Sequence, residues 1–161
     1  MGFNNIHFMI PHNEGLSEAE AIIARVEDSG LKRGEGGFCI YLCCDFPSNV
    51  TNATDFASLF DGLSLDIRKL PRWLGSGQIP FKEGVSQTAQ DQKNSMRNVL
   101  EGVNEACHDQ GLTFTVRGRL LTDASELVSL LVDIGVDAIS VNPEAIPSVT
   151  GWIAKAEEDK K

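Results

Sequence analysis

The most constraining feature of the sequence is the run at residues 38–45, which is apolar at nearly every position before its final aspartate. A strand with one face in water alternates apolar and polar residues, whereas a strand covered on both faces reads as a continuous apolar run. Such runs are typical of parallel sheets, because the helices that connect parallel strands cover the sheet. The run therefore predicts a buried parallel strand in an α/β fold.

Short apolar runs and helical periods alternate along the rest of the chain. Further strands are expected at 6–10, 62–67, 113–117 and 138–141. Helices are expected at 17–28, 51–60, 92–108, 123–134 and 147–156. Ser17 and Glu20 fit a capping box at the first of these helices, and Asp123 and Glu126 resemble one at the fourth. Five βα units predict a parallel sheet with right-handed crossovers, either open or part of a barrel.

Length and composition restrict the class of protein. With 161 residues, the chain is expected to form a single domain over 1–161, with a long loop at 71–90 and a frayed charged tail at 157–161. The 14 basic and 23 acidic residues give a net charge of −9, which argues against nucleic-acid partners and anionic membranes. Neither a membrane span nor a signal peptide is apparent in the pattern, so we expect a cytoplasmic protein.

The cysteines show no metal-binding pattern. Cys39, Cys43, Cys44 and Cys107 form no C-x-x-C pair, and no histidine pair stands at ligand spacing. Cys39 and Cys43 lie in the apolar run. We interpret them as small buried hydrophobic residues of a protein kept in a reducing compartment.

Several motifs go beyond this general pattern. Residues 30–37 read Gly-Leu-Lys-Arg-Gly-Glu-Gly-Gly, and residues 44–49 read Cys-Asp-Phe-Pro-Ser-Asn. Phe-Asp-Gly-Leu-Ser follows at 60–64, and residues 133–143 end in Ser-Val-Asn-Pro. In this order they resemble the phosphoenolpyruvate synthase (pyruvate, water dikinase) family, as does the early Phe-Met-Ile-Pro at 8–11.

The resemblance implies a fold and a set of cofactors. The C-terminal domain of this family is a TIM-type barrel that binds phosphoenolpyruvate or pyruvate with Mg²⁺, and the chain resembles its last five βα units. The phosphohistidine and ATP-grasp domains have no counterpart in the sequence. We therefore expect a partial barrel that requires neither Mg²⁺ nor ATP when alone.

The resemblance also implies which residues stand at the active-site positions. Asp45 takes the place of a glutamate that ligates the metal, and Lys69 takes the place of the second acidic ligand. Arg68 replaces a substrate-contacting asparagine, Arg117 replaces the cysteine that donates a proton to the enolate, and Gly118 is retained. A protonated ammonium group cannot ligate Mg²⁺, and a guanidinium group is no general acid near neutral pH. Asp45 is thus at most a weak metal ligand, and no catalytic residue is expected.

Positive charge gathers at the ends of the predicted strands. Arg68, Lys69, Arg117 and Arg119 all fall at or just after predicted strand ends. One interpretation is an anion site in which cations replace the lost metal, with phosphoenolpyruvate, phosphate or a dicarboxylate as the ligand. The other is that these charges are solvated or paired with Asp45 and Asp66 after the site lost its activity.

Two functions remain open from the sequence. The chain is either a catalytically inactive module that binds an anion or another protein, or a subunit of a split dikinase-type phosphotransferase, like phosphoenolpyruvate synthase or phenylphosphate synthase, active only with a partner chain. In either case a partial barrel has two exposed edge strands, which we expect at 6–10 and 138–141. A homo-oligomer or a partner chain that completes the barrel is therefore expected.

Overall fold

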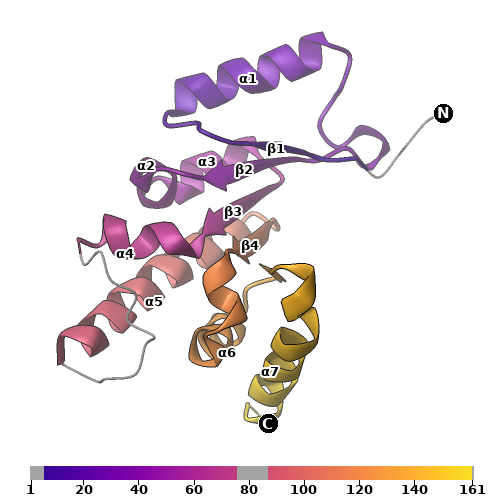
Figure 1. Cartoon of the computed structure of the whole chain (residues 1–161). Helices are drawn as coiled ribbons and strands as arrows, with labels where there is room; N and C mark the ends of the chain where they lie inside the picture. The colour runs from indigo at the N-terminus through magenta and orange to yellow at the C-terminus, as the bar shows by residue number, and fades with distance from the viewer. Residues whose placement is uncertain (1–5, 76–86, 161) are drawn as a thin grey trace.

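A computed structural model describes residues 6–75 and 87–160, and it shows one parallel sheet with the strand order β1-β2-β3-β4-β5 (Figure 1). The strands are β1 (Phe8–Ile10), β2 (Ile40–Cys44), β3 (Gly62–Asp66), β4 (Thr113–Arg117) and β5 (Ala138–Ser140). The sheet is not closed, so β1 and β5 are its edges. The predicted α/β class and both predicted edge strands are confirmed.

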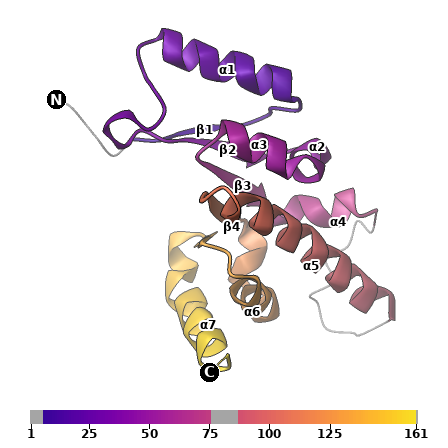
Figure 2. The same cartoon turned by 180° about the vertical axis from the view of Figure 1, so that it is seen from behind.

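Helices connect the strands in chain order. They are α1 (Leu16–Asp28), α2 (Pro47–Thr51), α3 (Ala53–Leu59), α4 (Leu70–Trp73), α5 (Gln87–His108), α6 (Ser125–Ile134) and α7 (Ile146–Glu158). Short 3₁₀ turns lie at η1 (Glu35–Gly37), η2 (Ile67–Lys69), η3 (Arg119–Thr122) and η4 (Pro143–Ala145). Seen from behind, α3 and α5 lie in front of the strands (Figure 2). No helix in the described part of the chain is both long and apolar enough to cross a membrane.

The core lies between the sheet and these helices. Ile40, Leu42, Leu65 and Val116 are fully buried in one cluster with α3 and α5 side chains such as Phe56. Period alone does not assign such residues to either face of the sheet, and these contacts place the four on the helix-covered face. The apolar positions of the strands serve the outer, helix-covered face, because amphipathic helices can bury them there.

The helix starts differ from the predicted capping boxes. Helix α1 begins after Gly15 and α6 begins after Ala124, and neither start has a side-chain cap hydrogen bond. Glu18 instead accepts a hydrogen bond from the backbone N–H of Glu14 at 3.2 Å. The favourable charge of an acidic first turn remains, although the reciprocal box does not form.

Two predicted irregular segments are shorter than expected. Of the loop expected at 71–90, helix α4 takes up the start and α5 begins at Gln87, while residues 76–86 lie outside the described residues. Helix α7 continues through Glu158 into the tail expected to fray at 157–161. Lys160 donates a hydrogen bond to the carbonyl of Val132 at 2.5 Å, which ties this end to α6.

Candidate functional site

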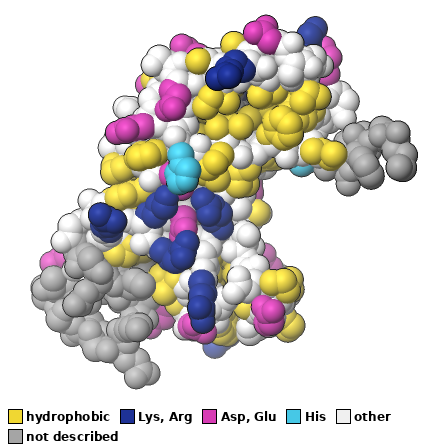
Figure 3. Space-filling view, turned by 45° about the horizontal axis from the view of Figure 1, so that its top comes forward, with side chains coloured by type: hydrophobic (Ala, Val, Ile, Leu, Met, Phe, Trp, Pro, Cys, Tyr) yellow, Lys and Arg dark blue, Asp and Glu magenta, His cyan; other side chains and the backbone are white. Residues whose placement is uncertain are grey.

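Charged side chains meet at the edge of the sheet where the parallel strands end. His12 follows β1, Asp45 follows β2, Asp66 ends β3 with Arg68 and Lys69 in the next turn, and Arg117 ends β4. Parallel strands bring their carboxyl ends to one edge. Figure 3 shows the result as Lys and Arg side chains surrounding acidic ones, with a histidine beside them. We call this group, with the neighbouring Arg119, the strand-end cluster.

Asp45 is held by the turn after β2. The side chain of Asn49 is buried and accepts hydrogen bonds from the backbone N–H groups of Asp45 and Phe46, both at 3.0 Å. This fixes Asp45 so that its carboxylate accepts a hydrogen bond from Lys69 and another, at 3.1 Å, from the backbone N–H of His12. The carboxylate is therefore almost fully enclosed, with 6% of the side chain exposed.

The carboxylate of Asp66 receives its hydrogen bonds from Arg68. Its carboxylate accepts two guanidinium bonds from Arg68, Nε to Oδ1 at 3.0 Å and Nη2 to Oδ2 at 2.6 Å. The same carboxylate accepts the backbone N–H of Arg68 at 3.1 Å, which caps the turn η2. Forked arginine–carboxylate pairs are among the strongest ion pairs in proteins, so Arg68 is occupied by its neighbour two residues away.

Both carboxyl groups are ionised near neutral pH. Burial disfavours their charged forms, but hydrogen bonds and nearby cations outweigh this effect. The bonds from Lys69 and the His12 N–H hold the pKa of Asp45 below its usual range. The bonds from Arg68 do the same for the pKa of Asp66. The strand-end cluster thus contains two carboxylates that are ionised near neutral pH, among its cations.

Arg117 bridges the two acidic groups but binds neither closely. Its guanidinium nitrogens lie 3.6 Å from Asp45 Oδ1 and 3.8 Å from Asp66 Oδ2. Its Nε is buried and has no hydrogen-bond partner in the described part of the chain. Gly118 follows with φ 141°, and a Cβ on it would lie 3.1 Å from Asp66 Oδ1. Arg117 also hydrogen-bonds to the Cys43 side chain, so its spare hydrogen-bonding capacity is at the buried Nε, and Gly118 makes room for Asp66 beside it.

Arg119 stands apart from these pairs. It opens the turn η3 and is exposed, and its side chain forms no ion pair or hydrogen bond with any residue that the structure describes. The structure thus brings Asp45, Arg68, Lys69, Arg117 and Gly118 together and places Arg119 next to them in the chain. It also shows that Asp45 and Asp66 pair with the cations.

His12 is the member that sequence reasoning missed. We found no ligand arrangement around any histidine, yet the His12 ring Nδ1 lies 3.5 Å from Asp45 Oδ2 with most of the ring exposed. It is the one non-glycine residue with positive φ, 53°, in the described ranges. A signal was present, because Pro11-His12 follows a predicted strand directly, as Asp45 does.

The side chains present are a poor match for a divalent cation. Among residues 6–75 and 87–160, no group of three or more His, Cys, Asp or Glu side chains could hold a metal ion. An ammonium group already binds Asp45, and a guanidinium fork binds Asp66. Mg²⁺ prefers several carboxylate and water oxygens, and nearby positive charge opposes its binding.

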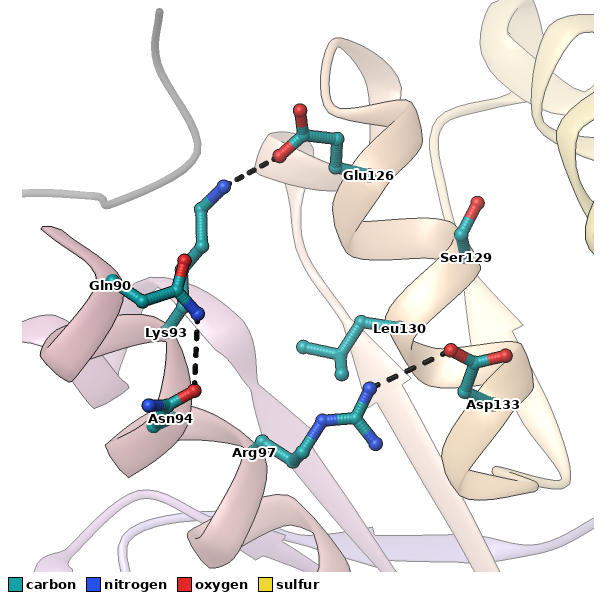
Figure 4. A pocket seen from close by; sticks show the side chains of 8 residues that line it. All are labelled: Gln90, Lys93, Asn94, Arg97, Glu126, Ser129, Leu130 and Asp133. Atoms are coloured by element: carbon teal, nitrogen blue, oxygen red, sulfur yellow. Dashed lines mark hydrogen bonds and ion pairs between the residues drawn. The ribbon is translucent and has the colours of Figure 1, made fainter. Parts of the chain in front are cut away.

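A hollow of about 320 Å³ lies between α5 and α6 (Figure 4). Its charges are paired across the two helices, Lys93 with Glu126 at 2.7 Å and Arg97 with Asp133 at 3.6 Å. Leu130 lies between these pairs (Figure 4). This arrangement is that of a helix–helix contact, and it places no unpaired charge in the hollow to recognise a ligand.

Comparisons with known proteins match the chain to one family. The model of the family "PEP-utilising enzyme, PEP-binding domain" matches residues 2–158. Phosphoenolpyruvate synthase of Helicobacter pylori is 30% identical over the whole chain, and that of Escherichia coli is 29% identical over 99% of it. The chain spans about a fifth of the length of these relatives, 20% in both cases.

Solved structures are similar in fold alone. RipC from Yersinia pestis superposes with a TM-score of 0.62 at 11% identity, over 91% of this chain and 63% of that one. A citrate lyase from Burkholderia xenovorans superposes with a TM-score of 0.61 at 16% identity, over 91% of this chain and 48% of that one. Together with the open parallel sheet, these matches identify the fold as part of a TIM-type barrel.

Proposed function

The chain belongs to the family of the PEP-utilising enzyme, PEP-binding domain, and from this premise we propose that it is a catalytically inactive domain that binds a small anion without a metal. Phosphoenolpyruvate, inorganic phosphate and a dicarboxylate are the ligands that the strand-end cluster suits. The anion takes the place at the strand ends where barrel enzymes hold their substrates.

The observation that carries the proposal is the incomplete pairing of Arg117. Its ion pairs are long, at 3.6 and 3.8 Å, and its buried Nε is unpartnered in the described part of the chain. An unsatisfied buried donor costs free energy, and a phosphate or carboxylate oxygen removes that cost. Arg119 is exposed and adds a cation that no described residue neutralises.

The absence of catalysis follows from the chemistry of the same residues. A guanidinium group stays protonated near neutral pH, so Arg117 can neither donate nor accept the proton that an enolate exchanges. Lys69 is bound to Asp45 and offers no ligand to a divalent cation while protonated. Arg117 and Lys69 are thus equipped to hold an anion and not to transform it.

Calorimetric titration with phosphate and with phosphoenolpyruvate tests the proposal. We expect binding that weakens as the salt concentration rises and that is lost in Arg117→Ala. Arg25→Ala removes the same charge from the last turn of α1 and serves as the matched control. Unchanged binding in Arg117→Ala, or no binding by the native chain, contradicts the proposed site.

The second candidate function is a subunit of a split phosphotransferase. The observation in its favour is the open sheet, which leaves room for a partner chain to complete the barrel. The test mixes the chain with Helicobacter pylori phosphoenolpyruvate synthase from which the matched fifth has been deleted, together with ATP, Mg²⁺ and pyruvate. Formation of phosphoenolpyruvate above that of the deleted enzyme alone supports the split enzyme, and an unchanged rate supports the inactive domain.

A further inference from the structure

The strand-end cluster lies over a row of uncharged side chains. Side chains alternate between the two faces of a strand, so Ser64 lies on the same face of β3 as Asp66, two residues before it. The register of the sheet places Cys43 of β2 and Thr115 of β4 on either side of Ser64. The charged pair of Asp66 and Arg117 forms the next row towards the strand ends. We call Cys43, Ser64 and Thr115 the floor of the cluster.

Arg117 crosses this floor. Strand β3 lies between β2 and β4, so a side chain from β4 that reaches β2 has to pass over β3. Arg117 does reach β2, because its guanidinium group hydrogen-bonds to the Cys43 side chain and lies 3.6 Å from Asp45 Oδ1. The side chain of Arg117 therefore lies over Ser64, which accounts for the almost complete burial of Ser64.

Two buried hydrogen-bonding groups meet in this space without a partner. Among the described residues, three buried side-chain atoms make no hydrogen bond, and two of them are Ser64 Oγ and Arg117 Nε. Native proteins leave few such groups unpaired, because each one costs free energy. Arg117 Nε only donates and a serine hydroxyl can donate, so a group that satisfies both accepts two hydrogen bonds.

The number and the kind of these donors match a carboxylate. Two donors serve the two oxygens of a planar carboxylate, whereas phosphate has more oxygens than the floor has donors. The guanidinium charge of Arg117 strengthens a hydrogen bond to a carboxylate. Cys43 adds no negative charge against such a ligand, because burial raises the pKa of its thiol and keeps it protonated near neutral pH.

We propose that the anion held by the strand-end cluster is an organic acid whose carboxylate lies innermost, between Arg117 Nε and the hydroxyl of Ser64. This inference rests on the proposed anion binding and names the class of its ligand. Ser64 is the residue that makes the site prefer a carboxylate to inorganic phosphate. A second anionic group of the ligand lies towards the mouth of the site, where Arg119 is exposed and pairs with no described residue.

The ligand can enter without breaking a close ion pair. The contacts of Arg117 with Asp45 and Asp66 are long, at 3.6 and 3.8 Å. Both carboxylates have nearer partners, which are Lys69 and Arg68 respectively. Arg117 can therefore turn away from both without leaving either of them unpaired. The entering carboxylate replaces these long contacts with shorter, charge-assisted hydrogen bonds.

Calorimetric titration with succinate and with inorganic phosphate tests the preference. We expect the native chain to bind succinate more tightly than phosphate. Ser64→Ala removes one hydrogen bond to a charged oxygen, so it should weaken succinate binding about tenfold or more and phosphate binding much less. Thr113→Val removes a hydroxyl from the same face of the sheet, at the level of Gly62 below the floor. This matched control should bind both ligands as the native chain does.

The melting temperature without ligand separates a ligand-binding serine from a structural one. A buried hydroxyl without a partner destabilises the folded chain, so Ser64→Ala should melt at the native temperature or above it. A serine that supports the fold, directly or through a bound water, gives a variant that melts several degrees lower. Such a drop, together with unchanged succinate binding, overturns the proposal.

Acetate tests the orientation of the ligand. It carries a carboxylate but no second anionic group, so its binding should weaken in Ser64→Ala and should be unchanged in Arg119→Ala. Succinate binding should weaken in both variants. Acetate binding that depends on Arg119 and not on Ser64 places the carboxylate at the mouth and contradicts the proposed orientation.

The same titrations separate this inference from the proposed function. A native chain that binds neither succinate nor phosphate refutes the anion site itself. Binding of both that is lost in Arg117→Ala but is unchanged in Ser64→Ala refutes the innermost carboxylate and leaves the anion site standing. An equal loss for succinate and phosphate in Ser64→Ala contradicts the preference for a carboxylate.

Discussion

The ammonium group of Lys69 hydrogen-bonds to the carboxylate of Asp45 and lies 3.3 Å from the main-chain carbonyl of the same residue. Two oxygens of one acidic residue thus hold a cation that belongs to the chain itself. The side chain of Lys69 is 32% exposed, so the contact is partly shielded from water. The sequence already placed a lysine at a predicted strand end, and the structure shows that its partner is the acidic residue of the preceding strand.

Metal removal should have no effect on the protein. We expect the same melting temperature with and without a chelator, and no calorimetric signal with Mn²⁺, because Lys69 occupies Asp45 and Arg68 occupies Asp66. Micromolar Mn²⁺ affinity that is lost in Asp45→Ala contradicts this prediction.

The isolated chain should form no phosphoenolpyruvate from ATP and pyruvate. The guanidinium group of Arg117 stays protonated near neutral pH, so this position can neither donate nor accept the proton of an enolate. A coupled assay with a no-protein control measures it. A rate above the control that persists after a second chromatographic step has removed contaminating enzymes contradicts an inactive domain.

Arg119→Ala and Arg68→Ala should differ in their effects. Arg119 pairs with no described residue, so its loss should weaken phosphate binding about two- to fivefold at low salt without lowering the melting temperature. Arg68 satisfies a carboxylate with only 3% of its side chain exposed, so its loss should cost about 1–3 kcal/mol of unfolding free energy. Urea unfolding and calorimetry separate the two effects. Equal loss of stability in both variants counts against the pairing that we describe.

Acid should destabilise the native chain partly through Asp66. Its folded pKa is below the unfolded value of about 3.9, so its contribution to stability is present above pH ~4 and is lost as the pH falls through the folded pKa. Asp66→Asn should therefore be less stable than the native chain at pH 7 and should lose less stability between pH 5 and 3. Asp109→Asn, at an exposed position, is the control, and thermal unfolding at each pH gives the comparison.

Gly62→Ala should be strongly destabilising although the backbone angles there are ordinary. A Cβ at Gly62 would lie 2.6 Å from the Tyr41 ring and 2.7 Å from the main-chain carbonyl of Thr113, which cannot move freely. We expect a loss of about 1–3 kcal/mol in urea unfolding. Gly151→Ala in α7 meets no atom within 4 Å and should be neutral or stabilising by up to about 1 kcal/mol. A neutral Gly62→Ala means that β2, β3 and β4 pack less closely than described.

The sequence predicted the positions of the strands better than it predicted which strand residues face the helices. Every expected strand is present, and β4 has the expected bounds, because short apolar runs between helices identify buried parallel strands. The inward or outward direction of Ile40 and Val116 depends on register. Period alone does not decide it when both faces are covered.

The candidate site was predictable to the extent that topology determines it. Residues after parallel strands share one edge, and this rule grouped Lys69 and Arg117, whereas Asp45 was named from the family resemblance. The rule does not specify which cation binds which carboxylate, because those contacts depend on side-chain rotamers. His12 was missed because a single histidine has no partner pattern in the sequence, and its contact with Asp45 spans 33 positions of the chain.

The strand order has one more consequence. In space each strand neighbours the strands that precede and follow it in the chain, so the sheet is built of successive units that contact mainly the adjacent ones. Repeat proteins share this property, and their stability is approximately the sum of each unit and its contact with the next. A barrel built in this way can lose or gain a βα unit at an end without disturbing the packing several strands away. In evolutionary terms, such a barrel is a modular array, and a stretch of it can persist as a folding unit.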